Sequence, residues 1–68
     1  MTIVDDAKKE INDVFGEFSA KKVEHFAEMV DPKKKPKDFL DMCKTFVAGM
    51  LGETFASEKF KRLYTKYC

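Results

Sequence analysis

The sequence predicts an all-α protein, a small bundle of three to four short helices over residues 1–68. Three observations support this fold class. Large apolar residues recur at three- and four-residue steps in every long segment, no segment alternates apolar and polar residues with a period of two, and glycine or proline separates the segments. A core in a chain of 68 residues is usually worth only about 3–5 kcal/mol. Completion of the bundle by dimerisation is therefore an open alternative.

The segment from Pro36 to Gly52 is expected to form the central helix, because it has the widest apolar face. Proline suits the first turn of a helix and glycine suits the position just after its end. We expect Phe46→Ala to cost about 3–5 kcal/mol if this face is the core. The residues of the face are Phe39, Leu40, Cys43, Phe46, Val47, Met50 and Leu51.

Two shorter helices are expected before this segment. Thr2 is a suitable N-cap for a helix that begins near Ile3 and ends between Phe15 and Phe18. Ser19 is the predicted N-cap of the next helix, with Phe18 and Val23 as a hydrophobic staple. The predicted inward residues are Ile3, Val4, Ala7, Ile11, Val14, Phe15 and Phe18 in the first helix, and Ala20, Val23, Phe26, Ala27 and Val30 in the second.

The apolar pattern changes phase near Gly52, after which Phe60, Leu63, Tyr64 and Tyr67 define a new stripe. Two structures fit this change. Residues 36–67 form either one bent helix or two helices, the second of them capped by Thr54 or Ser57. A break at Gly52 favours a compact four-helix monomer, whereas a continuous helix favours an extended dimer.

Charge is divided unevenly along the chain. Residues 1–31 contain eight acidic and four basic side chains, and residues 32–68 contain nine basic and four acidic ones, so the two halves carry −4 and +5. The favoured interpretation is that an acidic helical pair packs against a basic pair within one chain. Two other interpretations are antiparallel self-association of two chains and the binding of an acidic partner by the basic half.

Catalysis, metal binding and cofactor binding are not expected. His25 is the one histidine and is predicted at the surface. Cys43 is predicted in the core and Cys68 at an exposed end, so the two cysteines do not suggest a disulfide framework. Because the first residues lack a basic region followed by an apolar run, we expect no signal peptide. Because no apolar run approaches the length of a membrane span, we expect no such span and a cytoplasmic protein.

A nucleic-acid-associated role is the alternative function. Basic side chains interleaved with aromatic ones can contact phosphates and stack on bases. Against this role, the aromatic residues share one helical stripe and the whole chain carries a net charge of only +1. The candidate residues are Lys33, Lys34, Lys35 and Lys37 in the loop, and Lys59, Lys61, Arg62 and Lys66 in the last helix.

Protein–protein interaction is the favoured function, as a small non-catalytic regulatory module that forms a homodimer or binds another protein. The chain has seven phenylalanines and a large apolar surface for helices of three or four turns. Some of that surface is expected to remain exposed, and Met29 and Met42 add to it. The candidate interface residues are Phe39, Phe46, Met50, Phe55, Phe60 and Tyr64.

Overall fold

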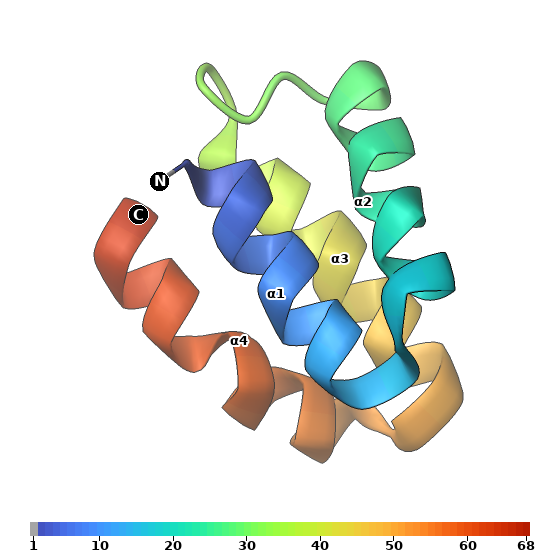
Figure 1. Ribbon diagram of the computed structural model, residues 1–68. Helices are drawn as coiled ribbons and strands as arrows, with labels where there is room; N and C mark the ends of the chain where they lie inside the picture. Colours follow the sequence, from blue (N-terminus) through green and yellow to red (C-terminus); the bar gives the residue numbers. More distant parts are fainter. Residues whose placement is uncertain (1) are drawn as a thin grey trace.

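The computed structural model describes residues 2–68 and confirms the all-α fold class. Its helices are α1 (Ile3–Phe15), α2 (Glu17–Met29), α3 (Pro36–Leu51) and α4 (Glu53–Tyr67). The chain reverses at a one-residue joint between α1 and α2 and again between α3 and α4, and both joints lie at the same end of the molecule (Figure 1). The longer loop after α2 connects the two hairpins at the opposite end.

The start of α1 agrees with the prediction. The Thr2 hydroxyl accepts a hydrogen bond from the Asp5 amide at 3.2 Å, and the Thr2 amide donates to the Asp5 carboxylate at 3.4 Å. This reciprocal capping box satisfies two backbone donors that the helix itself leaves without partners. Asp5 and Asp6 also place negative charge in the first turn, where the helix dipole favours it.

The start of α2 differs from the prediction. The helix begins at Glu17, with Gly16 rather than Ser19 before its first turn. Gly16 has φ +93°, a conformation that L side chains rarely adopt, and it reverses the chain in one residue. The reversal leaves Phe18 83% exposed, so the predicted staple and the predicted inward position of Phe18 are both wrong.

Gly52 makes a similar joint between α3 and α4, with φ +96°. Residues 36–67 are therefore two helices, the alternative that favours a compact four-helix bundle over an extended dimer built on one long helix. α4 begins at Glu53 rather than at a cap formed by Thr54 or Ser57. Buried alanines follow both joints at the same spacing: the Ala20 and Ala56 amides each donate to the carbonyl of the joint glycine at 3.2 Å. The two helical hairpins thus reverse the chain in the same way, with a glycine joint followed four residues later by a buried alanine. This similarity was not expected from the sequence.

The core lies between the two hairpins. α3 contacts all three other helices, as expected for a central helix, but α1 does so too. No contact joins α2 to α4 within residues 2–68, so these two helices cover opposite flanks. The buried apolar residues are Ile3, Ala7, Ile11, Ala20, Val23, Phe39, Leu40, Cys43, Val47, Ala56, Phe60 and Leu63.

Cys43 occupies the core position that the sequence predicts. Its side chain is completely buried, and burial raises the pKa of its thiol to about 12. A thiol with so high a pKa remains protonated at neutral pH and is a poor nucleophile. Cys68 is exposed and is also a free thiol.

Ion pairs join the acidic α1 to the basic α4. The Glu10 carboxylate lies 3.3 Å from Lys59 Nζ and 3.8 Å from an Arg62 guanidinium nitrogen. The Asp6 carboxylate lies 3.0 Å from Lys66 Nζ and also accepts a hydrogen bond from the Tyr67 hydroxyl. These contacts agree with the interpretation that unlike halves of the chain pair within one molecule.

The contacts of Asp6 with Lys66 and Tyr67, here called the α1–α4 seam, should make the stability of the protein depend on pH. Hydrogen bonds from Tyr67 and Lys66 lower the pKa of the Asp6 carboxyl below its ordinary value of 3.8. A carboxyl whose pKa is lower in the folded state contributes stability above its unfolded pKa, and loses that contribution as the pH falls through the folded pKa. We expect Asp6→Asn to lower the free energy of unfolding at neutral pH, measured by urea denaturation. The difference from wild type should vanish at a pH below the lowered pKa of Asp6.

The matched control for this prediction is Asp13→Asn, on an exposed part of the same helix. Asp13 takes part in no ion pair within residues 2–68, so its substitution should change stability little at either pH. Equal losses in the two variants at neutral pH would show that the Asp6 contacts do not stabilise the seam.

Candidate protein-interaction groove

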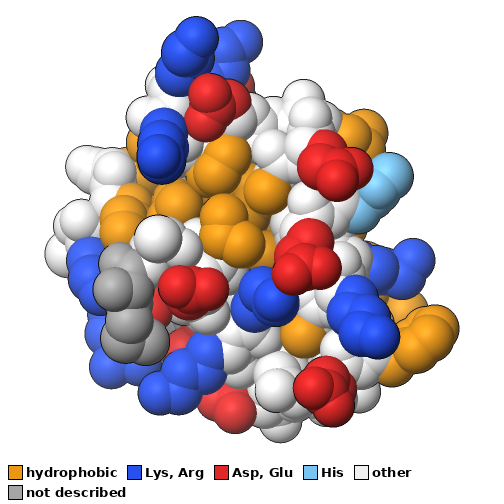
Figure 2. Space-filling model, turned by 45° about the horizontal axis from the view of Figure 1, so that its top comes forward, with side chains coloured by type: hydrophobic (Ala, Val, Ile, Leu, Met, Phe, Trp, Pro, Cys, Tyr) orange, Lys and Arg blue, Asp and Glu red, His pale blue; other side chains and the backbone are white. Residues whose placement is uncertain are grey.

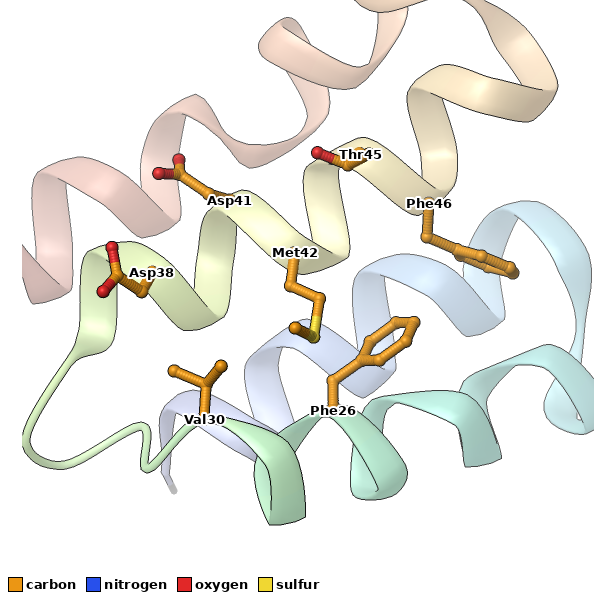
Figure 3. A pocket seen from close by; sticks show the side chains of 7 residues that line it. All are labelled: Phe26, Val30, Asp38, Asp41, Met42, Thr45 and Phe46. Carbon is orange, nitrogen blue, oxygen red and sulfur yellow. The ribbon is translucent and has the colours of Figure 1, made fainter.

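An open groove lies between α2 and α3 and is here called the α2–α3 groove. Figure 3 shows Phe26 of α2 and Val30, the residue just after α2, pointing across it toward Met42 of α3, with Phe46 beside Phe26. It is open to solvent, and its volume is about 680 Å³. The lining residues are Phe26, Val30, Asp38, Asp41, Met42, Thr45 and Phe46.

An aromatic cluster closes one end of this groove. The Phe46 ring lies edge-to-face with Phe26 at a centroid distance of 5.9 Å and with Phe15 of α1 at 5.7 Å. The Lys22 ammonium lies 6.0 Å from the centre of the Phe46 ring, at the limit of a cation–π contact. Three helices therefore fix the position of Phe46, and the phenyl ring remains half-buried at the mouth of the groove.

The charged side chains that line the groove are both acidic. Asp38 is exposed at the start of α3, and Asp41 is half-buried one turn further on. The Tyr64 hydroxyl of α4 donates a hydrogen bond to Asp41, and burial together with this carboxylate raises the pKa of Tyr64. Neither aspartate is in an ion pair within residues 2–68. The rim can therefore accept cationic groups from a partner.

A second, smaller hollow adjoins the groove on the outer side of α2. Phe18, Lys21, Lys22, His25 and Phe26 line it, and its volume is about 300 Å³. Because Phe26 lines both hollows, apolar surface continues from the α2–α3 groove onto the exposed side of α2. Two large apolar side chains of that side are mostly in water, Phe18 with 83% and Met29 with 63% of their surface exposed.

The structure divides the predicted interface residues into three groups. Phe39 and Phe60 are completely buried in the core, so they offer no surface to a partner in this structure. Met50 and Phe55 are exposed near the joint between α3 and α4, at 62% and 44%, beside Leu51 at 47%. Phe46 lines the α2–α3 groove, and Tyr64 is half-buried against Asp41. Residues that the sequence places on the same side of a helix are thus divided between the core and the surface in the structure.

The residues predicted to bind nucleic acid also fall into two groups, one in the last helix and one in the loop. In the last helix, Lys59, Arg62 and Lys66 pair with acidic residues of α1, and Lys61 is exposed. The loop residues are exposed, namely Lys33, Lys34, Lys35 and, at the start of α3, Lys37. Figure 2 shows acidic and basic side chains interspersed over one face of the molecule, apart from a basic group at its upper edge. This face is therefore not a continuous cationic surface of the kind that tracks a phosphate backbone.

Phe26, Val30 and Phe46 were predicted from the sequence as apolar positions, but not as the facing walls of a groove. Asp38 and the outer stripe of α2 were not predicted as parts of a site. One signal for that stripe was present: Phe18, Lys22, Phe26 and Met29 follow three- and four-residue steps on a second side of the helix. The predicted staple assigned Phe18 to the inner side, which concealed the pattern.

Residues 2–68 contain no group of three or more histidine, cysteine or acidic side chains placed to hold a metal ion. The exposed His25 imidazole lies 3.9 Å from the Glu28 carboxylate. No helix in this part of the chain has the length and apolar composition needed to cross a membrane.

Comparison of the chain with protein-family models, with curated proteins and with solved structures gave no match.

Proposed function

We propose that this protein is a small non-catalytic interaction module and that the α2–α3 groove is its protein-binding surface. The observation that carries the proposal is the groove itself, in which Phe26, Val30, Met42 and Phe46 face one another across an opening to solvent. Apolar grooves between helices commonly bind the apolar side of an amphipathic helix. A regulatory role is part of the same proposal, because a partner that binds the groove reversibly can switch between a bound and a free state.

The placement of these side chains supports the proposal. Each of them is half-buried, so the apolar lining of the groove remains open to solvent and accessible to a partner. Methionine at position 42 suits such a surface, because its flexible side chain adapts to the shape of a partner. The aspartates at the rim would fix the orientation of the bound segment by attracting cationic groups.

Site-specific photo-crosslinking tests this function. The photoreactive residue p-benzoyl-phenylalanine would replace Met42 in the groove or, as a control, exposed Thr65 on α4. Irradiation in cells that produce the protein naturally should give a protein adduct of discrete mass from position 42 that does not form from position 65. An excess of unmodified chain should reduce its yield. The proposal fails if position 42 gives no protein adduct, or if both positions label the same proteins equally.

A further inference from the structure

We infer that the occupant of the α2–α3 groove is helix α2 of a second copy of this chain, in a two-fold symmetric dimer. The inference rests on the proposed function, because it names the partner of the same groove. Four features of the described residues support it: a protruding apolar stripe, its continuity with the groove, the spacing of the two along one helix, and complementary charge.

The protruding stripe belongs to α2. Phe18 and Met29 are the large apolar residues of this helix that are most exposed. They are separated by eleven residues, or about three turns, and therefore lie on the same side of the helix. Lys22 and Phe26 occupy the turns between them. Within the single chain this stripe remains mostly open to solvent, apart from half-buried Phe26, so it is available to a complementary surface from outside.

The stripe and the groove form one apolar surface. Phe26 lines both the groove and the hollow that contains Phe18, and Phe46 packs edge-to-face against Phe26. A helix laid along this surface would cover Phe18, Phe26 and Met29 while its own apolar side chains filled the groove. Helix α2 of a second copy has such side chains and meets this requirement.

The spacing of these residues permits a closed dimer. Phe18 lies in the first turn of α2 and Val30 follows its last residue, Met29, so the two lie near opposite ends of the helix, about 18 Å apart at 1.5 Å per residue. In an antiparallel pair of α2 helices with a two-fold axis near residue 24, Phe18 of each copy lies opposite Val30 of the other. Both grooves are filled by the same contact, which is the condition for an isologous interface that stops at two copies. The exposed stripe of α2 in one copy thus binds in the α2–α3 groove of the other copy.

Charge favours this occupant as well. Exposed Lys22 belongs to the stripe that enters and exposed Lys21 precedes it, whereas the charged residues lining the groove are Asp38 and Asp41. A basic amphipathic helix from another protein would satisfy the same aspartates. It would not explain why Phe18 and Met29 protrude beside the groove, whereas the symmetric dimer uses both features.

Sedimentation equilibrium of purified chains tests the inference. We expect wild type to dimerise reversibly at micromolar concentrations, and Phe18→Asp to raise the dissociation constant at least tenfold, since it places a charge in an apolar contact. The matched control is Phe55→Asp, which alters an exposed phenylalanine away from α2 and should leave the dissociation constant unchanged. Circular dichroism would establish that both variants remain folded.

A charge exchange tests the orientation. Lys22→Glu alone and Asp38→Lys alone should each weaken the dimer several-fold, because each places like charges together. The chain that carries both substitutions should recover dimerisation, since each reversed residue then faces its reversed partner in the other copy. Failure of the double variant to recover would overturn the antiparallel arrangement.

The remaining outcomes separate this inference from the proposed function. A wild-type chain that stays monomeric at all concentrations would overturn the dimer, as would equal dissociation of the Phe18 and Phe55 variants. If the adduct from position 42 then has the mass of a different protein, the groove is a binding site and its partner is not a second copy. An adduct with twice the mass of the chain supports both.

Discussion

Replacing Phe39 with alanine should cost about 3–5 kcal/mol and unfold most of the protein at 25 °C. Phe39 is completely buried on α3 and belongs to the core that joins the two hairpins. Its removal exchanges a large ring for a cavity that the surrounding helices can only partly close. A single core in a domain this small is worth about the same 3–5 kcal/mol, so no reserve of stability remains.

Urea denaturation followed by circular dichroism measures this effect. Phe46→Ala should cost well below the same range, because Phe46 is half-buried at the mouth of the groove. This ranking corrects the sequence-based expectation that placed Phe46 among the most costly positions. Where Phe39→Ala is unfolded in water, Phe39→Leu provides a measurable variant, with an expected loss of about 1 kcal/mol. If Phe46→Ala proves as costly as Phe39→Ala, the core has been assigned wrongly.

Replacing Gly52 with alanine should destabilise the protein by about 1–3 kcal/mol. Gly52 has φ +96° and ψ 155°, a region of backbone conformation that is essentially restricted to glycine. A Cβ atom at this position would meet no heavy atom within 4 Å, so the cost arises from the backbone and not from a clash. Gly16→Ala should behave in the same way, since Gly16 adopts φ +93° and also has open space around it.

Gly49→Ala is the matched control for the joint glycines. Gly49 lies within α3 and lacks a positive φ, and a Cβ atom added there would likewise meet no heavy atom within 4 Å, so alanine fits without strain. Glycine in a helix interior is less stable than alanine by about 0.5–1 kcal/mol. Thermal or urea unfolding should therefore show a gain in stability for Gly49→Ala and a loss for Gly52→Ala. The same sign for both would contradict the one-residue joint.

Local sequence rules predicted the parts of this fold that depend on neighbouring residues. The N-cap position of Thr2 and the start of α3 at Pro36 each involve residues within one turn of a helix. The buried position of Cys43 followed from the apolar spacing of α3. In each case the decisive contact, or the helical periodicity, lies within a few residues along the chain.

The starts of α2 and α4 were predicted wrongly because a serine and a glycine near each start both suggest a helix boundary. Ser19 and Ser57 resemble N-caps, but an N-cap residue must have a non-helical backbone and stand just before the helix. At Gly16 and Gly52 the backbone reverses earlier, and the helix has already begun where the serines occur. Because α2 begins three residues before its predicted start, Phe18 lies in the first turn of α2 and not at the end of the first helix, which explains why it was placed in the core and is found in water.

The amino-acid sequence by itself determined the class of this protein, since apolar residues at helical spacing must be buried between helices whichever way those helices are arranged. The tertiary structure alone decided which apolar residues form the core and which form a surface. Phe39 and Phe46 share one helix and one stripe, but Phe39 lies between the hairpins, whereas Phe46 faces the opening between α2 and α3. That difference depends on how α2 and α3 lie relative to each other in the folded bundle, and helical periodicity carries no information about it.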